Sequence, residues 1–331
     1  MSFEQFILKE QYEKIRGLGD RLEFMKQQID WSQFIPLVKR VFYDDKIIGG
    51  RPHTDELIVV RSMLLQSWYG LSDEELEFQY HDRLSFRNFL GYPEKVPDFS
   101  TIWKIRERLK DAGIDNQIWD ELQRQLDKKG YIIKTGVIQD AAFIEADLGR
   151  KRHHKEKKAK KNGENIEYTE KQKSHIDKDG TFSVKHGQVH FGYKDHLKLD
   201  VDYHLIREIE TTTASLHDGE IDLIEEGDFA AYRDKGYFGR ELSAKNVKDM
   251  TMKRGTRARK INGGEQKRNR MISKIRAPGE RPFGVIKRVF HGGRIFVKTL
   301  ERVSIKEMFK AFGFNLYQLV TLEKKKLAKA I

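Results

Sequence analysis

The sequence predicts a helical N-terminal part followed by an α/β domain. Up to about residue 130, apolar residues recur at helical spacing between helix-capping signals. From residue 131 onward, runs with strand character alternate with helical stretches, which is the pattern of strands covered by helices. A chain of 331 residues is long enough for two domains at about 150 residues each. The predicted domains are residues 1–130 and 131–331.

The N-terminal part is predicted to consist of short helices joined by tight turns. Residues 1–30 carry apolar side chains at spacings of three and four, and an apolar helical pattern runs from Asp55 to about Trp68. Ser72 followed by Glu75 is a capping box that opens the next helix. A helix from Ile102 to Leu109 has basic residues on one side: Lys104, Arg106 and Arg108. These helices are compatible with a helix-turn-helix and equally with a plain helical bundle.

The second part is predicted to mix strands with helices. The strand-like segments are Tyr131–Ile144, Gln188–Val201, Leu205–Thr212, Phe229–Asp234 and a last one near Asp249. The helical segments are the acidic stretch His217–Asp228, a basic stretch through Ile275, Phe283–Phe290 and the amphipathic Ser304–Leu322. The first strand is apolar on both faces, as expected inside a sheet. A polar, basic stretch at about residues 150–180 follows it and is predicted to be a mobile insertion.

The formal net charge of +12 comes from two segments of the chain. Residues 150–163 contain eight Lys or Arg and one Glu, and residues 253–276 contain ten and one. The rest of the chain is therefore slightly acidic. One such run alone is typical of a solvated loop. Two runs that flank candidate site carboxylates favour nucleic acid as the partner, because phosphates attract Lys and Arg.

The composition also excludes several classes of protein. Cysteine is absent, so disulfides, thiolate metal sites and cysteine nucleophiles are excluded. The best apolar run begins at Leu57 and is cut by Arg61, which is too short to span a membrane. The N-terminus has an early acid, Glu4, and no basic start, unlike a signal peptide. We therefore expect neither membrane spanning nor secretion, and a cytoplasmic location.

Three carboxylates are candidates for a metal site. Asp140 lies in a strand that is otherwise apolar, where a carboxylate must be paired, protonated or metal-bound. Asp234 ends another strand before a Gly turn, and ligands gather at such strand ends. Glu280 lies in a basic region near a helix start, where the dipole favours its ionised form.

Three carboxylates of this kind can hold two Mg²⁺ ions, which prefer oxygen ligands. Two such ions can activate a hydroxyl and stabilise the leaving oxygen at a phosphorus. Among 51 acids, however, composition does not single out this trio. The rivals are Glu145, Asp147, Asp195, Asp218 and Asp228.

Motifs along almost the whole chain carry a family resemblance. They are GRPHTDELIVVRSMLLQSWYGLSDEELEFQYHDRLSFRNFLGY and VPDFSTIWKIRERL in the helical part, then VIQDAAFIEA, HFGYKDH, TTTASLHD, AYRDKGYFG and RAPGERPFGVIKRVF. In the last motif, Arg276, Glu280 and Lys287 have the spacing of Arg, three residues, Glu, six residues, Lys. With these motifs in this order, the chain resembles the DDE transposases of bacterial insertion sequences, specifically the insertion sequence 5 family.

The resemblance implies a ribonuclease H-like catalytic domain after a helical DNA-binding domain. It implies that Asp140, Asp234 and Glu280 are the catalytic, metal-binding triad, with two Mg²⁺ ions or Mn²⁺ in their place. It also implies that Arg276 and Lys287 contact DNA near the reacting phosphate. Further basic residues are expected on DNA: Arg288, Lys253, Arg254, Lys155, Lys157, Lys158, Lys160 and Lys161.

The activity implied is that of a transposase acting on double-stranded DNA. The helical domain would bind terminal inverted repeats, and the triad would hydrolyse a phosphodiester and transfer the exposed 3′-hydroxyl to target DNA. Because both ends must be held together, a homo-oligomer, a dimer or larger, is expected. The sequence departs from related proteins in two places. Ser273 stands where many have Tyr, and Pro278 and Pro282 flank Glu280, which argues against one continuous helix.

Two other functions stay open on the sequence. A DNA-binding regulator derived from a transposase is expected to have lost triad residues, whereas all three are present. A ribonuclease H-like nuclease that cuts without joining could share the triad. Only the N-terminal resemblance and the Arg–Glu–Lys spacing argue against it.

The remaining conspicuous residues have structural interpretations. His153 and His154 lie in the basic run, where solvation is favoured over zinc binding. His190 and His196 are expected to be satisfied structural histidines rather than DNA contacts. The four tryptophans are expected in the core, with insertion of one into DNA as the less favoured interpretation: Trp31, Trp68, Trp103 and Trp119.

Overall fold

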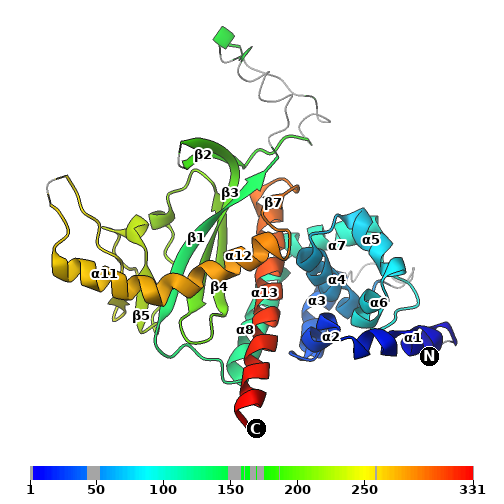
Figure 1. The fold of residues 1–331 in the computed structure, drawn as a ribbon. Helices are drawn as coiled ribbons and strands as arrows, with labels where there is room; N and C mark the ends of the chain where they lie inside the picture. The colour runs from blue at the N-terminus through cyan, green and yellow to red at the C-terminus, as the bar shows by residue number, and fades with distance from the viewer. Residues whose placement is uncertain are drawn as a thin grey trace.

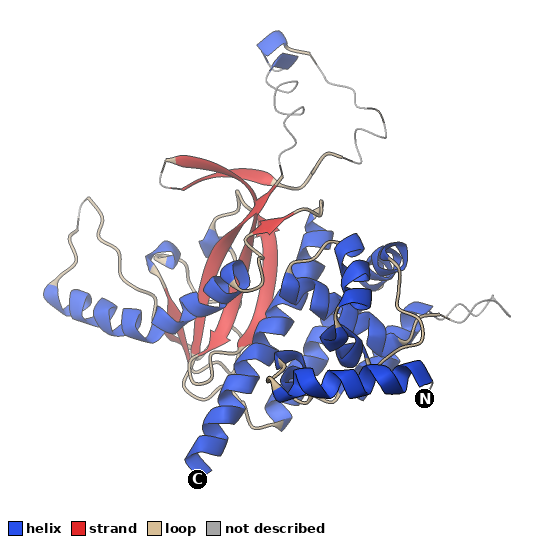
Figure 2. Ribbon diagram, turned by 45° about the vertical axis from the view of Figure 1, so that its right-hand side comes forward, coloured by secondary structure: helices blue, strands red, loops and turns tan. Residues whose placement is uncertain are grey.

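The computed structural model describes residues 3–42, 53–147, 158–159, 161–164, 169, 175–185, 187–257 and 259–330. A helical part and a mixed sheet lie side by side, and the C-terminal helix α13 runs between them (Figure 1). The sheet and the helices that cover it are shown by secondary structure in Figure 2. This agrees with the predicted order of a helical part followed by a sheet with helices.

The helical part begins with the chain and ends before residue 130. Its elements are α1 (Phe3–Gly17), α2 (Arg21–Lys26), the 3-10 turn η1 (Trp31–Phe34), α3 (Ile35–Phe42), α4 (Glu56–Tyr69), α5 (Asp73–Asp82), α6 (Leu84–Leu90), α7 (Phe99–Asp111) and α8 (Ile114–Lys128). The Asp55 side chain caps α4, Gly70 ends it at a φ of +63°, and Ser72 accepts from Glu75 N at the start of α5. Only half of the predicted capping box forms, because the Glu75 side chain accepts from Gln79 Nε2 at 2.6 Å.

The second part contains the sheet. Its strands are β1 (Val137–Ala146), β2 (Thr181–Lys185), β3 (Gln188–Asp200), β4 (Ile206–Thr213), β5 (Ala230–Arg233), β6 (Lys248–Asp249) and β7 (Arg294–Ile295). The order is β2-β3-β1-β5-β6, with β4 also paired to β3 and β7 to β1. The strands β2, β1 and β4 pair antiparallel with β3, whereas β5 and β7 pair parallel with β1, and β6 pairs parallel with β5.

Helices and short turns complete the second part. They are η2 (Asp218–Glu220), η3 (Lys235–Tyr237), α11 (Gly263–Arg276), η4 (Ala277–Gly279), α12 (Glu280–Arg288) and α13 (Leu300–Ala330). The helices α11 and α12 follow one another across the sheet, separated only by the single turn η4 (Figure 1). The prolines flanking Glu280 therefore interrupt the helix for one turn without redirecting the chain.

The two faces of the sheet are covered differently. On one face α13 packs on β4, and Asp195 of β3 lies beside Glu307 of α13. On the other face the acidic segment 214–229 covers the lysines of β3. Lys194 Nζ lies 2.8 Å from Asp218 Oδ1, and Lys198 Nζ lies 2.6 Å from Glu225 Oε2. The acids of this segment thus neutralise the half-buried Lys194 and the buried Lys198.

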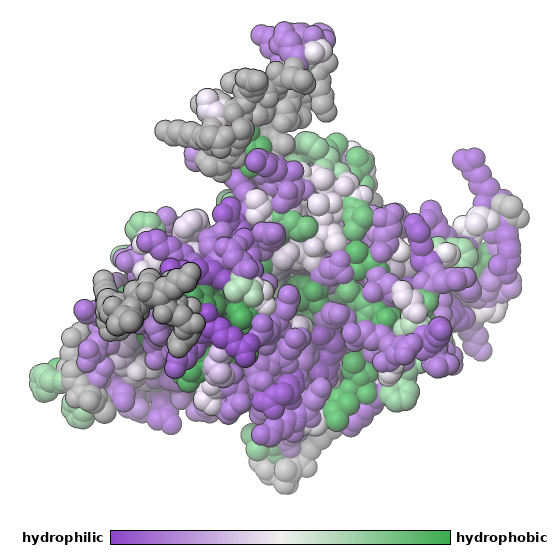
Figure 3. Space-filling model, turned by 180° about the vertical axis from the view of Figure 1, so that it is seen from behind, coloured by the Kyte–Doolittle hydropathy of each residue, from purple (hydrophilic) through white to green (hydrophobic). Residues whose placement is uncertain are grey.

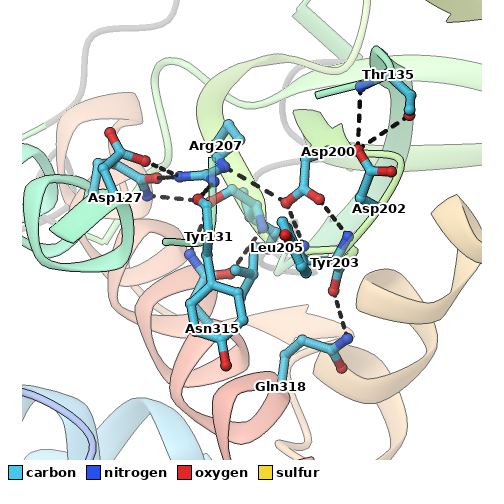
Figure 4. A network of polar contacts seen from close by, with 12 residues as sticks. Asp127, Tyr131, Thr135, Asp200, Asp202, Tyr203, Leu205, Arg207, Asn315 and Gln318 are labelled. Atoms are coloured by element: carbon cyan, nitrogen blue, oxygen red, sulfur yellow. Dashed lines mark hydrogen bonds and ion pairs between the residues drawn. The ribbon is translucent and has the colours of Figure 1, made fainter. Parts of the chain in front are cut away.

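A polar network ties α8, the β3–β4 hairpin and α13 together (Figure 4). Arg207 donates to the carbonyl of Tyr131 and to Asp127 Oδ1 at 3.1 Å. Asp200 accepts from the backbone N–H groups of the hairpin turn, and Asn315 both accepts from Ile206 N and donates to Ile206 O at 2.8 Å. Buried polar networks of this kind fix the relative position of the elements they join.

The hydrophobic core is continuous between the two parts. One cluster of buried side chains includes Phe34 and Leu64 from the helical part, Ile138 and Leu197 from the sheet, and Phe312 from α13. Within the described residues, no helix has the length and apolar character needed to cross a bilayer. On the face shown in Figure 3, hydrophilic residues predominate, and apolar residues form scattered patches. The domain boundary at residue 130 stays a prediction.

Several strand and helix predictions were wrong in their bounds. The strand predicted from Tyr131 begins at Val137, because residues 131–136 form a connection pinned by the Arg207 network. The predicted helix His217–Asp228 is a single 3-10 turn within a loop, since its acids bind the lysines of β3. The strand β2 was missed, and β7 follows the strand predicted to be last. The helix predicted from Phe283 starts at Glu280, and α13 extends beyond Ser304–Leu322 at both ends.

Two side chains of α7 differ from expectation. Trp103 is 46% exposed, whereas the other three tryptophans are buried as predicted. Arg106 is buried and donates to both carboxylate oxygens of Asp73 at 2.7 Å. It therefore stabilises the contact between α5 and α7 and does not form an exposed basic face with Lys104 and Arg108.

Candidate active site

Asp140 and Asp234 are brought together by the pairing of β1 with β5. The parallel register joins Val137 to Ala231, Ile138 to Tyr232 and Gln139 to Arg233. One further step in this register sets Asp140 level with Asp234, the residue that follows β5. Paired strands lie about 4.8 Å apart. Two residues far apart in sequence thus become neighbours at the end of the shorter strand.

The turn after β5 fixes the side chain of Asp234. Asp234 caps the 3-10 turn η3, and its Oδ1 accepts from Gly236 N at 2.7 Å. The carboxylate is half-buried. Its other oxygen makes no hydrogen bond within the part of the chain that the structure describes, so it is available to a ligand.

Glu280 reaches the same face through a close approach of η4 to β1. Ile138 and Asp140 are two residues apart in a strand and therefore point to the same face. A Cβ at Gly279 would stand only 2.9 Å from Ile138 Cγ2, so this glycine lets the turn rest on the strand. Glu280 follows as the first residue of α12, with its side chain exposed.

The pKa of Asp140 shows that the three carboxylates influence one another. Burial raises the pKa of Asp140, the Arg276 guanidinium opposes this, and the charges of Glu280 and Asp234 raise it further, to about 6. Asp140 is 9% exposed, so solvent screens these charges weakly. A carboxyl group whose pKa is raised by burial and by neighbouring acids is typical of functional sites.

Arg276 contacts Asp140 directly. It is the last residue of α11, and its Nη2 lies 2.8 Å from Asp140 Oδ2. Its Nη1 lies 3.9 Å from Met252 Sδ, and its Nε is buried without a hydrogen-bond partner among the described residues. The guanidinium is therefore held against the first carboxylate of the predicted triad.

The chemistry of these residues fits a divalent cation such as Mg²⁺. Three carboxylates converge on one face, and their mutual repulsion is what a bound cation would relieve. Among the residues the structure describes, no three His, Cys, Asp or Glu side chains are arranged closely enough to hold an ion. The assignment of Asp140, Asp234 and Glu280 as ligands stays a prediction.

The rival carboxylates are each engaged elsewhere. Asp195 is buried against Glu307, and the other rivals form ion pairs with basic side chains. These pairs are Asp218 with Lys194, Asp228 with Lys198, Glu145 with His190, and Asp147 with Arg294. None of the five carboxylates contributes to the charges that raise the pKa of Asp140.

The remaining predicted DNA contacts lie at several places. Lys287 and Arg288 are exposed on α12. Lys253 and Arg254 are exposed after β6, and Lys253 Nζ lies 5.6 Å from the centre of the Phe238 ring. Of the basic run, Lys158 and Lys161 are exposed, whereas Lys155, Lys157 and Lys160, like His153 and His154, lie outside the described residues.

The two sheet histidines have the expected local contacts. His196 is fully buried, its Nε2 lies 2.9 Å from Thr212 Oγ1, and burial lowers its pKa to about 4, so it is neutral at pH 7. His190 packs on the Phe143 ring and lies 3.4 Å from Glu145. Sequence reasoning missed the role of Gly279, although the Pro-Gly pair before Glu280 was the signal for a tight turn.

Comparison with known families adds independent information. The family model described as "Transposase DDE domain" matches residues 134–316, which is more than half of the chain. A second model, described as "Transposase domain (DUF772)", matches residues 9–108. No solved structure gives a significant match to the chain. The first match contains Asp140, Asp234 and Glu280, and the second covers most of the helical part.

Proposed function

Because this chain belongs to the DDE transposase family, we propose that it cuts DNA at the ends of its own element and joins them to a target. The observation that carries the proposal is the register of β1 and β5, which sets Asp140 level with Asp234 while η4 brings Glu280 to the same face. Terminal inverted repeats are the proposed DNA sites. A transposase that pairs two ends acts as a homo-oligomer in this proposal.

The proposed chemistry uses one site for two reactions. Water first attacks a phosphodiester at the element end and releases a 3′-hydroxyl. That hydroxyl then attacks a target phosphodiester, so one P–O bond forms as another breaks. Asp140, Asp234 and Glu280 would hold Mg²⁺, or Mn²⁺ in its place, which supplies Lewis-acid stabilisation of the oxygens at phosphorus. Arg276 and Lys287 would position the phosphate, and Asp140 must be ionised to act as a ligand.

The domain roles form part of the proposal. Strands β1 to β6 with α11 to α13 would be a ribonuclease H-like catalytic domain, and residues 1–130 would bind the terminal repeats. The family match over residues 9–108 supports a transposase-specific role for the helices. The exposed Lys158 and Lys161 support a DNA-contacting role for the basic insertion.

The decisive experiment uses a labelled duplex with the element end, a target plasmid and Mg²⁺. Wild-type protein should produce cleaved and joined DNA, and Asp234→Asn should produce neither while binding the end with unchanged affinity. Glu241→Ala, which changes an exposed acid in the same loop region, is the matched control and should be fully active. Activity in Asp234→Asn would overturn the triad assignment.

Two other outcomes identify the alternative functions. Cleavage that depends on Asp234 but yields no joined product would make the protein a nuclease. Tight binding of the end with neither product, in Mg²⁺ and in Mn²⁺, would make it a DNA-binding regulator. No binding of the end would overturn the proposal altogether.

A further inference from the structure

A hollow of about 460 Å³ lies between α2, the C-terminal end of α4 and α13. The helices α2 and α13 lie side by side (Figure 1), and residues of both helices line the hollow. None of the carboxylates of the candidate active site lines it. Its volume lies in the range of pockets that bind small molecules.

Aromatic side chains form the walls of this hollow. Trp68 is 6% exposed and stacks on Phe290 with the ring centres 4.5 Å apart, so its indole is held rigidly. Tyr317 meets Trp68 edge to face at 5.8 Å. Phe24 also lines the hollow and is 42% exposed. A fixed aromatic floor beside an exposed ring favours a flat, aromatic guest.

The rim of the hollow is cationic. Arg21, Lys324 and Lys325 line it, and all three are exposed. Among the residues that the structure describes, no Asp or Glu lines the hollow. In the part of the chain that the structure describes, these three cations form no ion pair, and Lys324 Nζ lies 5.0 Å from the centre of the Phe24 ring. The rim therefore favours a guest that carries negative charge next to its aromatic part.

An aromatic ring flanked by anionic groups is the chemistry of a nucleotide. We propose that the hollow between α2 and α13 receives a single nucleobase turned out of DNA. The base packs among Phe24, Trp68 and Tyr317, while the rim cations bind the adjoining phosphates. This inference rests on the proposed action on DNA. Stacking on aromatic side chains is strong enough to offset the unstacking of one base.

The test compares two duplexes that differ in one base pair. One is fully paired, and the other carries 2-aminopurine opposite an abasic site, where the base leaves the stack easily. The wild-type protein should bind the second duplex about tenfold more tightly, and the 2-aminopurine emission should be quenched by the aromatic walls. Phe24→Ala should remove the tenfold preference and leave affinity for the paired duplex unchanged. Phe24 is exposed, so this change spares the core.

Matched variants separate the hollow from general effects. Phe99→Ala removes another exposed ring, 48% exposed on α7, and should keep the preference. The double change Lys324→Gln and Lys325→Gln should lower the salt dependence of binding, whereas Lys128→Gln with Lys129→Gln, an exposed pair at the end of α8, should not.

The outcomes distinguish this inference from the proposed function. Equal affinity for both duplexes, or a preference retained in Phe24→Ala, would overturn the base-binding hollow while the transposase proposal stands. Saturable, Phe24-dependent binding of deoxyadenosine monophosphate without any preference between the duplexes would also overturn it, in favour of a free-nucleotide site. Absence of binding to either duplex would overturn both proposals.

Discussion

The guanidinium of Arg276 and the carboxylate of Asp140 form an ion pair, with Nη2 2.8 Å from Oδ2. Both side chains are 13% exposed, so solvent weakens their attraction little. The pair joins the end of α11 to β1 at the candidate active site. It opposes the burial and the neighbouring acids that raise the pKa of Asp140. Arg276 is therefore the group that keeps Asp140 ionised near neutral pH.

Replacing Arg276 should raise the pKa of Asp140 above its value of about 6. In Arg276→Gln, burial, Glu280 and Asp234 all favour the protonated form, and no cation opposes them. Carboxyl ¹³C NMR of the protein in the absence of added divalent ions measures this pKa directly. Arg281→Gln is the control, because Arg281 donates to Gln318 and does not contact Asp140. An unchanged or lower pKa in Arg276→Gln would show that the ion pair does not set this equilibrium.

Gly279→Ala should displace Glu280 and reduce cleavage at least about tenfold. The backbone of Gly279 is helical, with a φ of −61°, so alanine is strained only by the new Cβ against Ile138 Cγ2. Overpacking of this kind costs about 1–3 kcal/mol. Gly284→Ala in the same helix is the control, since nothing lies within 4 Å of its added Cβ.

A double-mutant cycle tests the cause of that loss. Ile138→Ala removes the opposing methyl group, so the stability costs of Gly279→Ala and Ile138→Ala should be less than additive. Chemical denaturation of the four proteins measures the coupling. Strict additivity would mean that the contact with Ile138 does not limit the size of residue 279.

Asp195→Asn should stabilise the protein increasingly as the pH rises. Burial and the neighbouring Glu307 raise the pKa of Asp195 well above its ordinary value. A raised folded-state pKa gives stability that is complete below the unfolded pKa of 3.8 and is lost as the pH rises toward the folded pKa. Asparagine stays neutral at every pH, so the variant does not lose this free energy of unfolding. The loss in the wild-type protein is about 1.4 kcal/mol for each unit by which the folded pKa of Asp195 exceeds its unfolded pKa.

Urea denaturation at pH 5 and pH 8 measures this effect. The free energy of unfolding of Asp195→Asn, relative to wild type, should be higher at pH 8 than at pH 5. Glu241→Gln, an exposed acid, should follow the wild-type protein at both values. Parallel pH profiles for Asp195→Asn and wild type would show that the Asp195 proton is not linked to folding.

Neutralising the basic insertion should weaken DNA binding and flatten its salt dependence. Changing Lys155, Lys157, Lys158, Lys160 and Lys161 to Gln removes five positive charges. If all five contact phosphates, the slope of log affinity against log salt should fall by about four. Titrations by fluorescence anisotropy at several salt concentrations measure it, with Lys128→Gln and Lys129→Gln as the control. An unchanged slope would exclude the insertion from the DNA interface.

The sequence predicted those helices and strands whose ends are determined by residues close by in the chain. The helix α4 was predicted from its apolar helical pattern, and in the structure Asp55 caps its start and Gly70 follows its end. The strand β5 was predicted from a short run that ends at the turn residues Lys235 and Gly236. Tyr131 was assigned to a strand because it is apolar and precedes two Ile, but the carbonyl of Tyr131 is bound by the distant Arg207.

The candidate site depended on relationships that no local pattern contains. The three carboxylates were chosen through a family resemblance, because the numbers of residues between them match no local sequence motif. Their convergence arises from the parallel pairing of β1 with β5 and from the contact of Gly279 with Ile138. The burial of Arg106 could not be predicted locally either, because its ion-pair partner Asp73 lies on another helix. Contacts between residues far apart in the chain therefore determine these features, and the sequence alone did not predict those contacts.

The position of α13 has a consequence for how the chain is made. This helix packs on α4 and on β4, and Phe312, Phe314 and Leu316 lie in the core shared by both parts. A ribosome synthesises residues 300–330 only after everything else described here. The first helices must therefore wait, with their apolar side chains uncovered, until α13 has been synthesised. A product cut short before Leu300 would expose that surface and become a target for chaperones and proteases, not a working DNA-binding fragment.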